Sequence, residues 1–254
     1  MVSDKNIKRI LGKEVLIYPL IPENIEGASI FLTASQLAWS LKSKKLAISD
    51  DGIVVPASDC IIIMSNESVA LSLKYSGICF PRVPNATRGL ISCTTYVKPG
   101  WVGKLAIVIC NPTSNDQTIQ INDPICVLSI VRLESRSSQK DIERKGVQFT
   151  IQMLKNLGIS VSPKEETDIS NNTYSNFKDM KYELVKSDTF IKFKEKNKTS
   201  WGSPINFLIV ATTIILIPLL ILTIRDLING VNVAPTLCAA VIAGLFVLLQ
   251  IKMK

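Results

Sequence analysis

Short apolar runs separated by turn residues dominate the first 134 residues of the chain. The runs are rich in β-branched and aliphatic side chains, and turns such as Asp50-Asp51-Gly52, Lys98-Pro99-Gly100 and Asn122-Asp123-Pro124 bound them. Runs of this kind predict strands. The predicted strands are 15–18, 29–33, 46–48, 61–64, 78–80, 105–110, 118–121 and 125–133. Strands this short and this frequent predict a compact, mainly β domain, with 34–41 left ambiguous.

The pattern changes near Glu134. Apolar residues recur at roughly helical spacing within 138–157, which predicts a helix that ends at Gly158 and packs on the β domain or on a neighbouring subunit. These residues are Ile142, Val147, Ile151, Leu154 and Leu157. Residues 160–200 are polar and rich in Asn, Ser, Thr and Lys. This composition predicts a semi-ordered stalk with an isolated apolar cluster at 190–193.

Two long uncharged stretches follow in the C-terminal part of the chain. Residues 205–224 contain about 20 residues, enough to cross a bilayer core of roughly 30 Å, and 234–251 reach the lower limit for a span. The segment between them, 225–232, is short and polar, as the turn of a helical hairpin is. The alternative is a buried helical pair in a soluble core. We therefore predict three parts: a β domain (1–134), a helix with a polar stalk (135–200) and a transmembrane hairpin (201–254).

Cations flank the predicted hairpin on its outer sides. They are Lys192, Lys194, Lys196 and Lys198 before the first stretch, and Lys252 and Lys254 after the second. The positive-inside rule then predicts a multi-pass membrane protein with both termini in the cytoplasm. Trp201 is an expected interfacial anchor. Lys196 and Lys198, before the first stretch, and Arg225, in the loop between the two stretches, are the other expected membrane-anchor residues.

The charge and the residue types exclude several function classes. The net charge is +8, but the lysines are dispersed and partly lie beside the predicted spans, which favours a solvated face and a membrane-proximal anchor over a nucleic-acid groove. The chain has no histidine, which excludes histidine bases, histidine-containing zinc sites and the zinc cytidine-deaminase signature. Six cysteines at 60, 79, 93, 110, 126 and 238 form no CxxC pair. In a reducing cytosol we expect small core residues, not disulfides. No metal or cofactor is predicted.

Five segments share one order and spacing with a known family. They are 10–12 (Ile-Leu-Gly), 16–19 (Leu-Ile-Tyr-Pro), 27–32 (Gly-Ala-Ser-Ile-Phe-Leu), 77–82 (Gly-Ile-Cys-Phe-Pro-Arg) and 97–103 (Val-Lys-Pro-Gly-Trp-Val-Gly). Together they resemble the dCTP deaminase and dUTPase family over about residues 6–134. The resemblance implies a dUTPase-like distorted β-barrel of the β-clip type. It also implies a homotrimer whose nucleotide sites lie between subunits.

The chain departs from this family where the family carries its chemistry. The family pattern G-x-I-T-L-E-L-x-N becomes 103–111 here, with Val108 in place of the catalytic glutamate, and valine cannot accept a proton. The diphosphatase branch uses an aspartate in a region that holds Thr95, Tyr96 and Lys98 here. A general base contributes about 10²–10⁴-fold, so we predict no catalytic residue and activity near background. A relocated base remains open, with Glu67, Asp116 and Asp123 as carboxylates nearby in sequence.

Ligand binding is predicted to survive around the phosphate-binding motif. Segment 82–90 aligns with the family's R-S-S-x-x-R-x-G-L, but only its first arginine and the Gly-Leu pair match. Arginine is a bidentate phosphate donor. The candidate ligands are Arg82 and Arg88 for phosphate, Asn85, Thr87, Thr94, Thr95 and Tyr96 for hydrogen bonds, and Trp101 for a base. Trp101 is equally a candidate for filling the barrel wall.

Three functions fit this sequence. The first is a membrane-anchored, non-catalytic nucleotide sensor, similar in plan to two-span membrane effectors of prokaryotic antiviral systems. The second is an active, divergent dCTP deaminase or dUTP diphosphatase tethered to the membrane. The third is a scaffold that recruits a cytosolic protein to the membrane without a small ligand. The expected partners are further copies of the chain, a nucleotide, membrane lipids and, for the third function, the recruited protein.

Overall fold

The computed structural model describes residues 1–138 and 146–197. Contacts divide the chain into two units, of which the first, Met1–Lys196, contains nearly all of the described residues. Within the described ranges no helix is long and apolar enough to cross a membrane. The two stretches predicted to span the bilayer, 205–224 and 234–251, lie outside the described residues, as do Lys198, Trp201 and Arg225.

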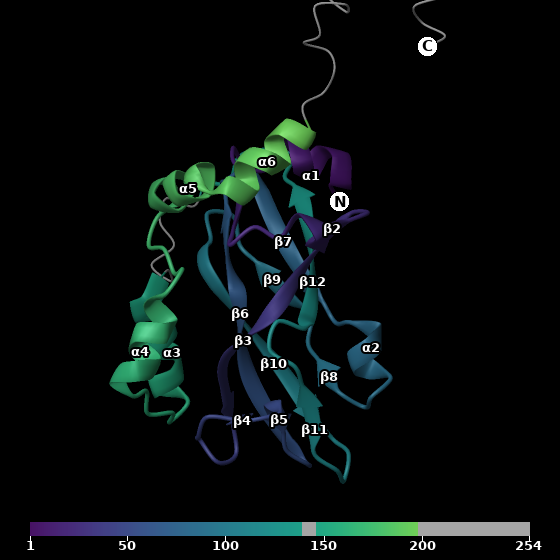
Figure 1. Cartoon of the computed structure of the whole chain (residues 1–254), viewed down its shortest axis with the longest axis vertical. Helices are drawn as coiled ribbons and strands as arrows, with labels where there is room; N and C mark the ends of the chain where they lie inside the picture. Colours follow the sequence, from purple (N-terminus) through teal and green to yellow (C-terminus); the bar gives the residue numbers. More distant parts are fainter. Residues whose placement is uncertain (139–145, 198–254) are drawn as a thin grey trace, which may run out of the picture. The chain divides into compact units, whose positions relative to one another are not determined.

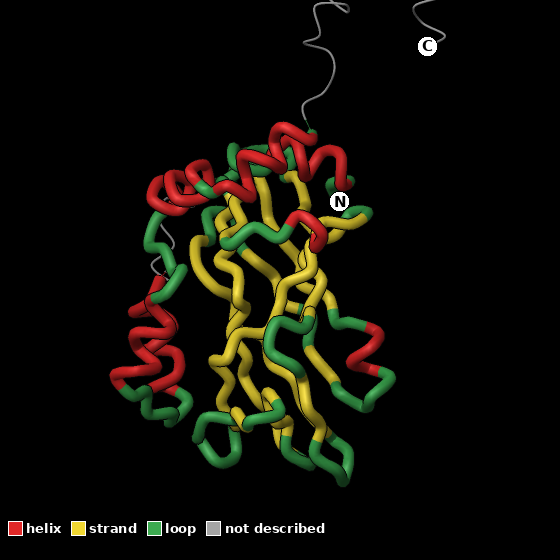
Figure 2. Tube along the Cα trace, viewed as in Figure 1, coloured by secondary structure: helices red, strands yellow, loops and turns green. Residues whose placement is uncertain are grey.

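A curled sheet forms the centre of the first unit, and four of the described helices follow its last strand in sequence (Figures 1 and 2). The mainly β fold class is therefore confirmed. The main sheet runs in the order β8-β10-β6-β3-β12-β7-β9, with β1 on β6 and β2 on β3, while β11-β5-β4 form a smaller sheet. The strands are β1 (Val15–Tyr18), β2 (Ile25–Glu26), β3 (Ser29–Ser40), β4 (Ile48–Ser49), β5 (Gly52–Val55), β6 (Asp59–Leu71), β7 (Tyr75–Phe80), β8 (Ile91–Ser92), β9 (Thr95–Val97), β10 (Val102–Asn111), β11 (Gln117–Ile119) and β12 (Pro124–Arg132).

Strand β3 explains how the sheet curls. Its first half pairs with β12 up to Thr33, and its second half pairs with β6 from Ala34 onward, so the strand changes neighbours in its middle. At this crossing the backbone N–H and the hydroxyl of Thr33 donate to the carboxylate of Glu67 on β6, at 2.9 and 2.8 Å. The residues left ambiguous by the sequence, 34–41, thus mostly belong to a long strand.

Two apolar clusters hold the unit together. The larger one fills the curl of the sheet and extends to α5 (Phe177–Lys186) and α6 (Asp188–Lys196). The smaller one joins Leu37, Trp39 and Met64 of the sheet to α3 (Gly146–Asn156) and α4 (Pro163–Ser170). The indole N–H of Trp39 also donates to Glu165 of α4 at 2.7 Å. The helices therefore belong to the same packed unit as the strands.

The prediction of a polar stalk at 160–200 is wrong for its described part. This segment forms α4, α5 and α6, and their apolar side chains enter the cores of the domain. Met180 and Leu184 are 0% exposed, and Phe190 and Phe193 are 6% and 4% exposed. Sparse apolar residues at helical spacing are enough to dock a helix when each one is fully buried. The capping box of Ser162 and Glu165 begins α4.

The expectation that the cysteines are all unpaired is also wrong. Cys60 of β6 and Cys110 of β10 form a disulfide. They are direct partners in the antiparallel ladder, which brings their side chains together once the two strands pair. Cys79 and Cys126 are free and buried, as expected of small core residues, while Cys93 is exposed.

Candidate nucleotide-binding site

The segment between β7 and β10 carries most of the predicted ligand residues. It contains the short helix α2 (Val83–Ala86), then β8, which pairs with β10, and then β9, which pairs with β7. Strands β8 and β9 are the two ends of the main sheet, yet only Cys93 and Thr94 separate them in sequence. This short connection brings the two ends of the sheet together. The candidate site therefore lies where the curled sheet closes on itself.

Both predicted phosphate-binding arginines lie on this segment, and both already use some of their donors. Arg82 donates to the carbonyl of Pro124 at 2.9 Å, and its guanidinium lies 5.4 Å from the centroid of the Phe31 ring. Arg88 donates to the carbonyl of Thr118. A guanidinium has five N–H donors, so each arginine keeps donors for a ligand. These contacts hold the segment against the start of β12 and against β11.

Asn85 lies between the two arginines, in α2. It is 8% exposed, and its Nδ2 has no hydrogen-bond partner among the described residues. Its backbone groups are hydrogen-bonded. The N–H of Asn85 donates to the carbonyl of Arg82, and its carbonyl accepts from the backbone N–H groups of Arg88 and Leu90. A buried amide without a partner costs free energy, so this Nδ2 is a donor that a bound acceptor would satisfy. Thr87, nearby, donates to the carbonyl of Pro84 at 3.0 Å.

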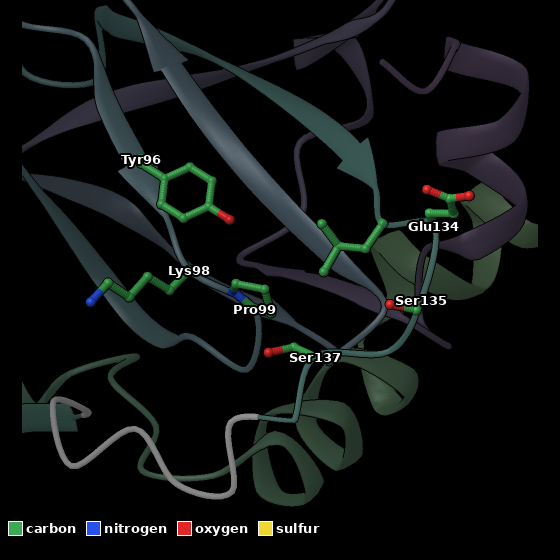
Figure 3. A pocket seen from close by; sticks show the side chains of 7 residues that line it. Tyr96, Lys98, Pro99, Glu134, Ser135 and Ser137 are labelled. Atoms are coloured by element: carbon green, nitrogen blue, oxygen red, sulfur yellow. The ribbon is translucent and has the colours of Figure 1, made fainter.

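The remaining predicted ligands are dispersed around this segment. Thr94, Thr95 and Tyr96 are exposed. Tyr96 lines an open hollow of about 480 Å³ together with residues of the segment that follows β12. Figure 3 shows Tyr96 turned toward this hollow, while the side chain of Lys98 extends away from Glu134. The other residues lining the hollow are Pro99, Leu133, Ser135 and Ser137.

Trp101 is half-buried beside helix α3. Its indole N–H donates to the carbonyl of Gly103 at 3.1 Å, and its ring meets Phe149 edge-on with centroids 6.1 Å apart. These contacts give the ring a packing role between the sheet and α3. Its role as a base-stacking residue stays a prediction.

Val108 stands on β10, directly opposite Ile62 of β6 in the ladder. Its neighbours Ile107 and Ile109 are buried, whereas Val108 itself is half-buried. Val108 thus belongs to the opposite face of the strand from these two core residues. Strand β8, which follows the candidate phosphate segment, pairs with β10 at Ile109, one residue further along.

The three carboxylates considered as relocated bases occupy other positions. Glu67 is 2% exposed and both of its oxygens accept from Thr33, and burial raises the pKa of its carboxyl although these hydrogen bonds oppose the shift. Asp116 accepts from the backbone N–H of Ala57 at 2.8 Å. Asp123 is exposed on the turn before β12. Glu67 and Asp116 therefore have structural partners.

A buried lysine was not predicted from the sequence. Lys104 of β10 is 7% exposed, and burial lowers the pKa of its ammonium, while the nearby charges of Asp168 and Glu67 oppose that shift. Lys104 stands near Glu67 because Lys104 pairs with Ser68 in the ladder. One lysine in an apolar strand was the signal in the sequence. In residues 1–138 and 146–197, no cluster of three or more metal-binding side chains is found.

A family model described as dCTP deaminase-like matches residues 1–133, more than half of the chain. The chain belongs to the dCTP deaminase-like family. The family resemblance seen in the sequence is thereby confirmed for the β domain. The family model ends close to the predicted boundary at residue 134, before α3 begins.

Similar proteins share this half of the chain. The dCTP deaminase of Pyrococcus furiosus is 26% identical over 125 residues, which make up 49% of this chain and 80% of that protein. The dCTP deaminase of Pyrococcus abyssi is 23% identical over 126 residues, covering 49% and 81%.

Among solved structures, the 2′-deoxycytidine 5′-triphosphate deaminase of Agrobacterium tumefaciens aligns with 14% identity and a TM-score of 0.43, over 51% of this chain and 45% of that one. The native EIAV dUTPase aligns with 17% identity and a TM-score of 0.37, over 52% and 98%.

Proposed function

We propose that this member of the dCTP deaminase-like family is a membrane-anchored, non-catalytic nucleotide sensor. The observation that carries the proposal is Val108, an aliphatic side chain at the position where the family pattern places its catalytic glutamate. A side chain without a proton acceptor cannot activate water, and a positioned base supplies about 10²–10⁴-fold in rate. Loss of this carboxylate removes the base for the chemical step, while Arg82, Gly89 and Leu90 of the phosphate-binding pattern are kept.

Nucleotide binding is supported by the donors around α2. Arg82 and Arg88 keep free guanidinium donors, and the buried Nδ2 of Asn85 lacks a partner in the described part of the protein. A phosphate group offers several strong acceptors, and charge-assisted hydrogen bonds to arginine are about twice as strong as neutral ones. We propose that a nucleotide phosphate is bound by these three side chains.

We also propose a homotrimer, as the family resemblance implies. Three apolar side chains on and beside the candidate site are well exposed: Val83 by 74%, Ile91 by 58% and Tyr96 by 55%. Contact between subunits would remove these side chains from water. In a trimer, the proposed spans 205–224 and 234–251 of three chains would bring six spans together. A rearrangement of the subunits on nucleotide binding would then disturb the bilayer, as in the two-span membrane effectors of antiviral systems.

The test is a paired measurement of turnover and binding on the purified full-length chain. We expect no turnover of dCTP or dUTP. We also expect that at least one nucleotide, from a panel that includes cyclic dinucleotides, raises the thermal stability of the protein. A ligand at 100 times its Kd stabilises the folded state by about 2.7 kcal/mol. Arg88→Ala should reduce that rise. Arg132→Ala, which removes an exposed arginine at the far end of β12, should not.

The alternative is an active, divergent dCTP deaminase or dUTP diphosphatase. This alternative is supported by the relatives at 23–26% identity, which are dCTP deaminases. Turnover of dCTP or dUTP that Asp123→Asn abolishes would establish the alternative and refute the sensor. A protein that shows no turnover and no response to any nucleotide would favour the third function, a scaffold for a cytosolic partner.

A further inference from the structure

The end of the domain where α1 (Asp4–Ile10) meets α6 presents a cluster of exposed cations. The two helices are in contact, because the ring of Phe190 packs against Gly12 and the ammonium of Lys194 donates to the carbonyl of Lys8 at 3.1 Å. Figure 1 shows them side by side at the end of the sheet opposite β4 and β5. The exposed cations, which define the α1–α6 face, are Lys5, Arg9, Lys13, Lys192 and Lys196.

The α1–α6 face has a net positive charge even when the ion pairs within it are taken into account. Residues 4–13 and 188–196 together hold seven cations and three carboxylates. Asp4 is paired with Lys8 at 3.7 Å, and Glu14, next along the chain, is paired with Lys74 at 2.9 Å. None of the five cations of the face forms an ion pair with another residue of the described ranges. A positive surface of this kind favours an anionic partner.

The chain itself indicates what that partner is. Helix α6 ends at Lys196, and a linker of only eight residues, 197–204, separates it from the uncharged stretch 205–224. Eight residues reach at most about 29 Å even when fully extended. The sequence of this linker contains one further cation, Lys198, and Trp201, a residue type enriched at membrane interfaces. The α1–α6 end is therefore the part of the domain with the shortest connection to the proposed span.

We propose that the α1–α6 face lies on the anionic headgroups of the bilayer that residues 205–224 enter. The inference rests on the proposed membrane anchor and adds an orientation to it. The face contacts lipid, while the turn between β3 and β4 points away from the membrane. Each cation near an anionic lipid surface favours contact by about fivefold. Several such contacts hold the domain in one orientation and leave the proposed nucleotide site along the side of the sheet.

Lysine acylation on the full-length protein tests this orientation directly. The protein is reconstituted in vesicles of phosphatidylcholine, or of phosphatidylcholine and phosphatidylserine in equal parts, and labelled with a water-soluble acylating reagent. We expect Lys5, Lys13 and Lys192 to react about fivefold more slowly in the anionic vesicles. The internal control is the exposed set Lys42, Lys44 and Lys45 at the opposite end, whose rates should not differ between the two lipids.

A pair of charge variants tests the cause. Lys5→Gln/Arg9→Gln/Lys13→Gln should abolish the slow labelling of Lys192 in anionic vesicles. Lys42→Gln/Lys44→Gln/Lys45→Gln removes the same charge from the other end and should leave it intact. High salt should also speed the labelling of Lys192, because the screening length for exposed charges falls from about 8 Å at physiological ionic strength to about 3 Å at 1 M.

The possible failures are distinguishable. Protein that a high-salt wash strips from the vesicles is not anchored, and this result overturns the proposed anchor and the inference together. Protein that stays in the vesicles but labels equally at both ends, in both lipids, overturns the orientation alone. Protection of Lys5, Lys13 and Lys192 by a DNA or RNA oligonucleotide in lipid-free detergent would identify a nucleic-acid surface and overturn the proposal.

Discussion

Replacing Phe190 by alanine tests whether the segment after α3 is part of the domain. Phe190 of α6 is 6% exposed, and its ring fills the space beside Gly12. Truncating a buried phenylalanine costs about 3–5 kcal/mol, because transfer energy is lost and a cavity is left. The adjacent Ile191 is 45% exposed. Ile191→Ala is the matched control and should change the free energy of unfolding by less than about 0.5 kcal/mol.

A substitution of Gly12, which contacts the ring of Phe190, measures the energetic coupling between these two residues. Gly12 has φ of +81°, and a Cβ added there would lie 2.3 Å from Cζ of Phe190. Gly12→Ala therefore carries a backbone cost of roughly 1–2 kcal/mol and a steric cost in addition. In the Phe190→Ala background only the backbone cost remains. We expect the effects to be non-additive by about 1–3 kcal/mol, the range for residues in direct contact.

Urea unfolding of the full-length chain in detergent micelles measures these differences. Tryptophan fluorescence is a suitable probe, because Trp39 is fully buried where the sheet meets α3 and α4. Midpoint shifts at constant urea dependence report changes in stability. If Phe190→Ala unfolds at the same urea concentration as Ile191→Ala, α6 is not packed on the domain. That result would restore the polar stalk.

Three further predictions concern the core and the assembly. Burial raises the pKa of Glu67, so its stabilising contribution is present below pH 4.5 and is lost as pH rises through the raised value. Glu67→Gln, which mimics the protonated side chain, should gain stability relative to the parent as pH rises from 4 to 7 in urea titrations. Reducing the Cys60–Cys110 disulfide, which spans 50 residues, should lower the free energy of unfolding by about 4 kcal/mol, and an unchanged urea midpoint would contradict the link. Ile91→Asp should convert the proposed trimer to monomers in sedimentation, whereas an unchanged size would place the interface elsewhere.

The β domain and its family could be predicted from the residue pattern alone. Short apolar runs predicted β1 at 15–18 and parts of β3, β6, β7, β10, β11 and β12, while the run predicted at 46–48 meets β4 only at Ile48. Turn residues marked the connections, because glycine, proline and asparagine act on the backbone locally. Strands β2, β5, β8 and β9, each of two to four residues, were missed. The candidate ligand residues also came from sequence, through motif order and spacing.

The pairing of segments that are distant along the chain could be seen only once the chain was folded. The carboxylate of Glu67 accepts from Thr33, and Cys60 forms a disulfide with Cys110. The indole N–H of Trp39 donates to Glu165, which is 126 residues away along the chain. The packing of α5 and α6 on the sheet could not be predicted from the sequence either. These helices have few apolar residues, and the residues around them in the sequence are polar. Pattern analysis follows neighbours along the chain, whereas burial and hydrogen bonding depend on neighbours in space. A polar segment becomes part of a core when the sheet offers its few apolar side chains a place to be buried.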